Sequence, residues 1–370
     1  MERVKVGIVG CGCISGIYLT NLTTIFHRII EVYAVADLIQ EREDHAAVTY
    51  HVPHQMKFEQ MLEDPNIEMI LNITTPKDHY WICKAALEAG KHVYVEKPLS
   101  LTKEQGSELV TLAEKKGLYL GDAPDTFLGG GLQTCRKAID DGLIGDPIGA
   151  TAFMVCHGHE SWHPDPEFYY QVGGGPMFDM GPYYLTALVS MLGPAKEVCG
   201  MTAVTFPERT ITSEKKYGQK VQVEVPTHVT GCIRFQSGAI ATMITSFDVW
   251  DSTLPRIEIY GTRGTLVVPD PNTFGGPVMV RCSFHTGFSE LPLTHIYSEN
   301  SRGLGLADMA VAIRTGRRHR ANGEMANHVL ELMHAFHTSA ESGKYEQLAT
   351  SCRRPDPLPL GLLPGQVEVE

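Results

Sequence analysis

The chain has 370 residues, of which 43% are apolar, 20% charged and 8% aromatic, an ordinary globular composition that excludes disordered, collagen-like and coiled-coil classes. Because a single core rarely grows beyond about 250 to 300 residues, this length predicts two domains or one large one. Acidic residues outnumber lysine and arginine by 43 to 31, and the net charge of −12 argues against a broad surface for nucleic acid.

No apolar run approaches the ~20 residues that a membrane helix needs, and the first residues lead directly into a strand-like pattern. We therefore expect a cytoplasmic protein without a membrane span or an export signal. The nine cysteines are scattered, which is not typical of a disulfide framework. Only Cys11 and Cys13 lie close together, and without a second Cys or His pair at zinc spacing, loop packing is favoured over a metal or redox role.

The first third of the chain alternates two kinds of segment. Short apolar or β-branched runs, typical of strands, lie at 4–9, 31–36, 68–73, 92–95 and 118–120. Segments with helical spacing lie between them, at 14–26, 78–89 and 103–115. This alternation predicts a parallel sheet with helices on its faces.

The first predicted strand leads into a Gly-x-Gly-x-x-Ser loop that opens a helix. Gly10 permits the tight turn and Gly12 lets the backbone approach a pyrophosphate, while Cys13 and Ile14 offer amide groups at the positive end of the helix. Asp37 ends the second strand, where its carboxylate can accept hydrogen bonds from the adenosine ribose. A carboxylate repels a 2′-phosphate, so the sequence predicts NAD rather than NADP as the cofactor.

After residue 125 the pattern changes to one helix, at 128–141, followed by several extended runs. These runs lie at 150–157, 228–235, 239–249, 257–260, 265–268 and 278–282. Turn residues at 236–238 and 261–264 predict hairpins, and two helices are expected at 304–315 and 323–342. We therefore expect an α/β protein with three parts. The first is a Rossmann domain at 1–123, and the last is an extended tail at 349–370. Between them, at 124–348, we expect an α+β domain with an open, largely antiparallel sheet that serves substrate binding and oligomerisation.

The strand at 92–95 is followed by Glu96-Lys97-Pro98. These three residue types are unfavourable in a buried strand. Pro98 ends the ladder and places Lys97 at the carboxyl edge of the sheet, where such folds bind their ligands. A partly desolvated ammonium group beside a nicotinamide ring can donate to a substrate oxygen. The alternative is that Lys97 is an ordinary surface lysine before a turn, without a functional role.

With Gly10, Gly12, Asp37 and Glu96-Lys97-Pro98 in this order, the sequence resembles the Gfo/Idh/MocA family, which includes glucose-fructose oxidoreductase and inositol dehydrogenase. The resemblance spans nearly the whole chain. Two further segments carry it, Ile73-Thr74-Thr75-Pro76-x-x-His79 and the glycine-rich run 173–183 that ends in Asp-x-x-x-Tyr.

The resemblance implies NAD(P)-dependent oxidation or reduction of a secondary alcohol on a sugar, cyclitol or related polyol. It also implies a cofactor crevice that Thr74, Thr75, Pro76, His79 and Glu96 help to line. The catalytic residues it implies are Lys97, Asp179 and Tyr183. The sequence has tyrosine at position 183, where many members carry histidine.

The residues themselves support this chemistry. On a helix Asp179 and Tyr183 would share a face, and a hydroxyl beside a carboxylate can bind a substrate diol. Tyrosine has a pKa near ~10, so as a base it needs a cation such as Lys97 within ~4 to 6 Å. Pro182 is a poor interior helix residue, which predicts either a kink or a helix start at this residue. Tyr184 is a competing candidate.

A run of histidines and one tryptophan precedes the glycine-rich segment. Sugar rings stack on aromatic rings and imidazole binds hydroxyls, so Trp162 and His163 suit a polyol pocket. A metal site made of His157, His159 and His163 is a weaker alternative, because hydride transfer to NAD needs no metal, and we expect none. Asp125, after the last Rossmann strand, is a candidate contact for the nicotinamide amide.

These observations predict an NAD-dependent oxidoreductase that transfers hydride between the nicotinamide and a ring hydroxyl or ketone of a sugar, a glycoside (including its 3-hydroxyl) or a cyclitol. Tyr183 or His163 would accept the proton while Lys97 stabilises the developing alkoxide. Two alternatives remain, an NAD-recycling enzyme that cleaves glycosides and a non-catalytic NAD(H)-binding redox sensor. We expect a polyol as the small-molecule partner, neither nucleic acid nor membrane, and a homo-oligomer, either dimer or tetramer.

Overall fold

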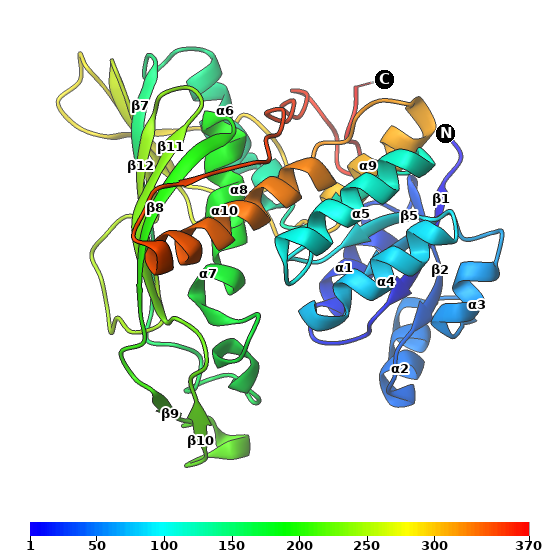
Figure 1. The fold of residues 1–370 in the computed structure, drawn as a ribbon. Coiled ribbons are helices and arrows are strands. Elements are labelled where there is room, and N and C mark those ends of the chain that lie inside the picture. Colours follow the sequence, from blue (N-terminus) through cyan, green and yellow to red (C-terminus); the bar gives the residue numbers. More distant parts are fainter. Residues whose placement is uncertain (370) are drawn as a thin grey trace.

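In the computed structural model, which describes residues 1–369, the N-terminal lobe contains a six-stranded sheet in the order β3-β2-β1-β4-β5-β6 (Figure 1). Its strands are β1 Val4–Val9, β2 Ile30–Ala36, β3 His54–Gln55, β4 Met69–Asn72, β5 His92–Val95 and β6 Leu120–Asp122. All neighbouring strands run parallel. The predicted parallel sheet is therefore confirmed, and its strand order is that of a dinucleotide-binding fold.

Five helices connect these strands. They are α1 Ser15–Thr24, α2 Gln40–Tyr50, α3 Phe58–Glu63, α4 Pro76–Glu88 and α5 Lys103–Lys116. The sequence did not predict α2, because that helix is polar around most of its surface and buries only Glu43 and Ala46. Gly117 caps α5 in the left-handed conformation, with a φ of 64°, as expected of a glycine at this position.

The second lobe contains a nine-stranded sheet in the order β16-β15-β14-β13-β7-β12-β11-β8-β17. Its strands are β7 Pro147–Val155, β8 Ala195–Ala203, β11 His228–Phe235, β12 Ile240–Ser246, β13 Ile257–Gly261, β14 Gly264–Val268, β15 Val278–Cys282, β16 Ser289–Leu291 and β17 Glu346–Gln347. Only β7 and β12 pair in parallel, so the largely antiparallel sheet is confirmed. Both predicted hairpins, β11 with β12 and β13 with β14, are present.

Helices cover one face of this sheet and leave the other uncovered (Figure 1). The covering helices are α6 Gly130–Asp140, α8 Gly181–Leu192 and α10 Gly323–Ser342. The predicted helix at 128–141 begins later than expected, because a short 3₁₀ turn, Thr126–Leu128, precedes α6. A small two-stranded sheet, β9 Glu208–Thr210 with β10 Lys220–Gln222, extends below the main sheet (Figure 1).

The chain crosses between the lobes more than once. It leaves the Rossmann sheet after β6 and returns with α9, Leu304–Thr315, which packs beside β6. The amide of Asp122 then donates to the carbonyl of Ala321 over 3.2 Å. Residues 304–322, predicted to belong to the second domain, therefore contact the first, and the domain limit near Ala123 stays a prediction.

The last described residues follow an extended path across both lobes (Figure 1). The amide of Leu358 donates to Gln133 Oε1 over 2.8 Å, and Tyr297 donates its hydroxyl to the carbonyl of Gln366 over 2.6 Å. Among residues 1–369, no helix combines the length and apolar character that crossing a bilayer requires.

Candidate active site

The glycine-rich loop between β1 and α1 has the shape that a pyrophosphate requires. Gly10 has a φ of 102°, and a Cβ there would lie 2.8 Å from the carbonyl oxygen of Ile73, so a side chain does not fit. At Gly12, by contrast, a Cβ would meet nothing within 4 Å. No acceptor within residues 1–369 takes the backbone amides of Cys13 and Ile14. These free amides at the start of α1 fit a bound phosphate group.

Asp37 lies beside this loop, at the end of β2. Its Oδ2 accepts a hydrogen bond from the amide of Cys11 over 2.6 Å, and its Oδ1 accepts one from the amide of Ile39 over 2.8 Å. The carboxylate is therefore held in place next to the loop. Cys11 is buried, and burial raises the pKa of its thiol to about 12, in keeping with a packing role.

The segment after β4 lies beside the glycine-rich loop, because the backbone of Ile73 and Thr74 approaches Gly10. Thr75 precedes α4 and Pro76 begins it, while the hydroxyl of Thr74 donates to Asn72 Oδ1 over 2.7 Å. The His79 ring is buried, with Nδ1 2.7 Å from the carbonyl oxygen of Pro98 and Nε2 3.1 Å from that of Thr74. His79 thus links the loops that follow β4 and β5, and both of its ring nitrogens are occupied by backbone carbonyl groups.

The side chain of Asp125 binds backbone amides around the start of α9. Its buried Oδ2 accepts hydrogen bonds from the amides of Gly303 and Gly305, over 2.8 and 3.0 Å. Burial raises the pKa of this carboxyl to about 6. The side chain holds the start of α9 through this oxygen, and the contact with the nicotinamide stays a prediction.

Lys97 and Asp179 form the centre of the site. Lys97 Nζ donates to Asp179 Oδ1 over 2.9 Å and to the Asp179 carbonyl over 2.7 Å. Burial opposes charge on both groups, but Lys97 and the His159 ring hold the pKa of Asp179 at about 2. Asp179 and Tyr183 in turn keep the pKa of Lys97 above its usual value despite burial. At neutral pH the pair is therefore an ammonium and a carboxylate.

Glu96 supports Lys97 from behind. Its Oε1 accepts from the Tyr18 hydroxyl over 2.7 Å, and its Oε2 accepts from the amide of Lys97 over 3.0 Å. The Glu96 carboxylate is buried at the end of β5, so this side chain orients the loop and does not face open space.

Asp179 and Tyr183 lie on two helices and not on one. The short helix α7, Gly175–Asp179, ends at Asp179, and α8 begins at Gly181 with Pro182 in its first turn. The predicted helix start near Pro182 is therefore present, and the shared helix face is not. Even so, Lys97 Nζ lies 5.3 Å from the centre of the Tyr183 ring.

Tyr183 is the tyrosine of this site, and Tyr184 is not. Tyr184 is buried near Arg256 and Asp270 on the side of the second sheet. Burial raises the pKa of the Tyr183 hydroxyl, and the Lys97 and Arg302 cations oppose that rise without reversing it. The hydroxyl is therefore protonated at neutral pH.

His159 is the histidine that reaches Asp179. Its Nε2 lies 3.2 Å from Asp179 Oδ2, and the ring is buried. His163, which the sequence predicted as a substrate contact or proton acceptor, accepts the amide of Asp165 at its Nδ1 over 3.1 Å. Trp162, the other predicted residue, packs beside His159 with ring centres 5.2 Å apart.

The three histidines considered as a metal site are not brought together. The His157 ring stacks on Trp250, with ring centres 3.4 Å apart and planes inclined by 14°, and His159 binds Asp179. No group of three or more suitable ligands forms anywhere in the described part of the chain.

Two residues that the sequence did not indicate complete the surroundings. Arg302 lies beside the Tyr183 hydroxyl, where its Nη2 donates to Asn272 Oδ1 over 2.7 Å. Tyr169 lies close enough to Asp179, Lys97 and Cys13 for their charges to affect the pKa of its hydroxyl, which burial raises. Both residues reach the site only through tertiary packing.

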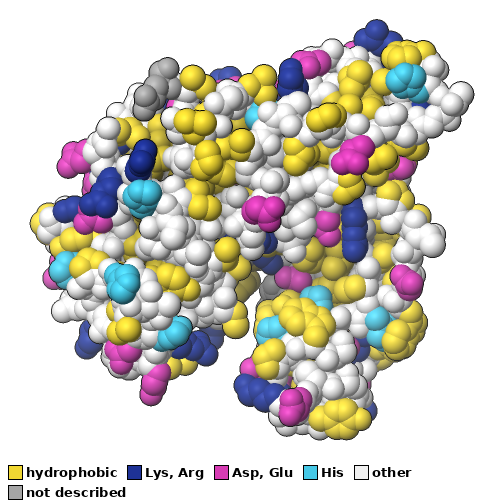
Figure 2. Space-filling view, turned by 180° about the vertical axis from the view of Figure 1, so that it is seen from behind, with side chains coloured by type: hydrophobic (Ala, Val, Ile, Leu, Met, Phe, Trp, Pro, Cys, Tyr) yellow, Lys and Arg dark blue, Asp and Glu magenta, His cyan; other side chains and the backbone are white. Residues whose placement is uncertain are grey.

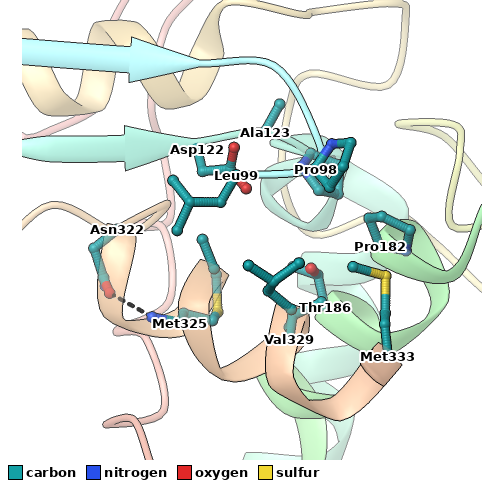
Figure 3. A pocket seen from close by; sticks show the side chains of 13 residues that line it. Pro98, Leu99, Asp122, Ala123, Pro182, Thr186, Asn322, Met325, Val329 and Met333 are labelled. Carbon is teal, nitrogen blue, oxygen red and sulfur yellow. Dashed lines mark hydrogen bonds between the residues drawn. The ribbon is translucent and has the colours of Figure 1, made fainter. Parts of the chain in front are cut away.

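A small cavity lies between the lobes behind Pro98, lined also by Asp122, Pro182 and Met325 (Figure 3). Its volume of about 10 Å³ holds about one water molecule. Asp122 Oδ1 has no hydrogen-bond partner within residues 1–369. Burial, with Glu96 nearby, raises the pKa of Asp122 well above its usual value. This cavity is too small for substrate, and its apolar lining favours the protonated form of the Asp122 carboxyl.

Comparison with known proteins identifies the family and agrees with the fold. Residues 4–121 match the family model described as "Oxidoreductase family, NAD-binding Rossmann fold", and residues 132–267 match the "GFO/IDH/MocA C-terminal domain". Myo-inositol 2-dehydrogenase from Thermotoga maritima is 24% identical over 269 residues, 71% of this chain and 74% of that protein. A 1,5-anhydro-D-fructose reductase from Ensifer adhaerens is 30% identical over 241 residues, 64% of this chain and 67% of the relative.

Among solved structures, levoglucosan dehydrogenase in complex with NADH superimposes with a TM-score of 0.80 at 20% identity, covering 94% of this chain and 100% of the other. An NAD-binding oxidoreductase from Klebsiella pneumoniae superimposes with a TM-score of 0.82, also at 20% identity, with the same coverage. At these identities the likeness concerns the fold.

Proposed function

The chain belongs to the Gfo/Idh/MocA family of oxidoreductases, with an NAD-binding Rossmann fold at its N-terminus, and on that basis we propose that it transfers hydride between NAD and a ring hydroxyl or ketone of a sugar, glycoside or cyclitol. The observation that carries this proposal is the ion pair of Lys97 with Asp179. It lies at the carboxyl end of β5, the sheet edge at which folds of this kind bind their ligands.

The amides of the glycine-rich loop and the Asp37 carboxylate would hold NAD, which would supply the acceptor for a hydride from the substrate carbon. Lys97 has three N–H donors, and Asp179 takes two of them. The third can bind the substrate oxygen and stabilise the negative charge that develops there. Asp179 holds the ammonium in one position, so no reorganisation is needed when that charge appears.

We propose that His159 accepts the hydroxyl proton. The ionised Asp179 carboxylate can only accept hydrogen bonds, so His159 Nε2 must donate to it, and Nδ1 of the neutral ring then carries the free lone pair. No hydrogen bond within residues 1–369 occupies Nδ1. Tyr183, protonated at neutral pH, is better suited to donate a hydrogen bond than to accept a proton, and His163 is turned to Asp165.

A substrate screen tests this function. Protein shown to bind NAD is incubated with methyl glycosides, free sugars and inositols, and both NADH and ketone products are measured. Ketone with stoichiometric NADH is the expected result. Free sugar released without net NADH would instead identify the NAD-recycling cleavage of glycosides. Tight NAD(H) binding without turnover on any substrate would identify a redox sensor.

We also propose that the protein is a cytoplasmic homo-oligomer. The uncovered face of the nine-stranded sheet supports this proposal, because it exposes apolar side chains such as Met201 and Ile240. Light scattering on the purified protein distinguishes a dimer or tetramer from a monomer.

A further inference from the structure

We propose that an aromatic wall beside Asp179 binds an aromatic aglycone, the ring that a glycoside carries on its anomeric carbon. This inference rests on the proposed function and names the substrate class more closely. The wall consists of His159, Trp162, His163, Phe168 and Tyr169. These residues follow β7, in the lobe that also holds β9 and β10.

The wall begins at the reacting groups. The His159 ring, which binds Asp179, has its centre 4.0 Å from that of Tyr169 and 5.2 Å from that of Trp162. Tyr169 continues to Phe168, whose ring centre is also 4.0 Å away. His163 contacts both Trp162 and Phe168, at 5.3 Å each. An unbroken series of ring contacts therefore leads from Asp179 toward the surface.

The outer end of the wall is open. Trp162 is 61% exposed and Phe168 is 49% exposed, while His159 is buried. Figure 2 shows hydrophobic side chains and histidines together on the lower right lobe, at the edge of the hollow that separates it from the Rossmann lobe. Exposed tryptophan and phenylalanine rings that continue a catalytic site are unusual for a free surface and typical of a binding surface.

The neighbouring polar groups favour an aromatic occupant over a second sugar ring. A sugar ring needs free polar side chains to bind its hydroxyls, but here the charged groups bind one another. Asp165 pairs with Lys215 at 2.6 Å and with Lys216 at 2.9 Å, and Lys216 also pairs with Glu167. The wall thus offers mainly ring faces, and the polar atoms it leaves without a partner within residues 1–369 are single atoms at ring edges, namely His159 Nδ1, His163 Nε2 and the Tyr169 hydroxyl.

The experiment compares phenyl and methyl glycosides of the same sugar, across a panel of sugars. In the wild-type protein with NAD, we expect kcat/KM to be about tenfold higher for the phenyl glycoside, because each aromatic pair contributes about 0.5 to 1.5 kcal/mol. In Phe168→Ala and Trp162→Ala this ratio should fall toward one. Trp81, on α4, is 64% exposed and packs on Tyr80, so Trp81→Ala is the matched control and should keep the wild-type ratio.

A second readout does not depend on turnover. Quenching of tryptophan fluorescence by a nitrophenyl glycoside measures binding to the NAD-loaded protein, and Phe168→Ala should weaken that binding about tenfold. Equal kcat/KM for the two glycosides in the wild type, or a preference that survives both substitutions, would overturn the inference. Turnover of methyl glycosides without a phenyl preference would leave the proposed function standing. If no glycoside is turned over but the nitrophenyl glycoside quenches fluorescence and Phe168→Ala weakens that quenching, only the proposed function is refuted. If there is neither turnover nor quenching, both the proposed function and this inference are refuted.

Discussion

Lys97 Nζ lies 2.9 Å from Asp179 Oδ1 and 2.7 Å from the Asp179 carbonyl oxygen, although the two residues are 82 positions apart and belong to different lobes. Lys97 follows a Rossmann strand, and Asp179 ends a helix of the second lobe. The reacting site therefore exists only where the two lobes are packed together.

The substitution Lys97→Met should nearly abolish turnover. It removes the donor proposed to stabilise the alkoxide and leaves the Asp179 carboxylate buried without its main partner, so we expect kcat to fall about 10²- to 10³-fold. Single-turnover NADH formation measures the effect, and NAD titration shows whether the cofactor still binds. Lys103→Met, at the exposed start of α5, is the matched control. A near-normal kcat in Lys97→Met would show that Lys97 does not stabilise the alkoxide.

His159→Asn should lower kcat about 10²- to 10⁴-fold, the usual range for loss of a general base. His159→Ala should show a similar loss, and added imidazole should restore part of its activity, because truncation of the buried ring leaves room for a free base beside Asp179. Tyr183→Phe should retain more activity, since the raised pKa of Tyr183 keeps its hydroxyl protonated. If Tyr183→Phe proves the more damaged variant and imidazole rescues neither, Tyr183 and not His159 is the proton acceptor.

Asp37→Asn should weaken NAD binding and reduce discrimination against NADP. A hydrogen bond to a charged group contributes about 1.5 to 3 kcal/mol, so we expect KM for NAD to rise at least tenfold. KM for NADP should rise less, because the repulsion of the 2′-phosphate is removed. Glu41→Gln, on the exposed side of α2, controls for the change in net charge. If KM rises by the same factor for NAD and NADP, the adenosine ribose does not contact Asp37.

Asp122→Asn should stabilise the protein at neutral pH. A carboxyl whose pKa is raised in the folded state stabilises that state below its unfolded pKa of about 4, and this contribution is lost as the pH rises through the folded value. The neutral amide avoids that loss. Thermal unfolding should show a higher Tm for the variant at pH 7.5 and little difference at pH 3.5. A lower Tm at pH 7.5 would mean that the carboxylate is ionised and paired.

Local patterns predicted much of this protein. The turn at Gly10, the carboxylate of Asp37 and the position of Lys97 are each predicted by a strand, a loop or a proline that lies within a few residues of that position. Parallel strands then bring their carboxyl ends to one sheet edge. The same logic missed α2, because a polar helix on the surface carries no apolar stripe.

The partners of Asp179 could not be predicted in the same way. His159 and His163 lie in one short run, and strand alternation cannot choose between them because Gly158, with a φ of 81°, interrupts the extended chain. Arg302 lies 119 positions beyond Tyr183 and approaches it only through the loop before α9. Residues that meet across a tertiary contact leave no signal in local spacing.

The segment that returns to β6 after the second lobe limits where the chain can be cut into stable fragments. β6 pairs with β5 on one side, and on the other it is covered by the segment around Ala321 and Asn322. A fragment that stopped at residue 123 would lack that segment and would present an open strand edge to other molecules, the usual route to edge-to-edge aggregation. A stable cofactor-binding fragment therefore needs residues from both ends of the sequence, joined as a fused or co-expressed pair.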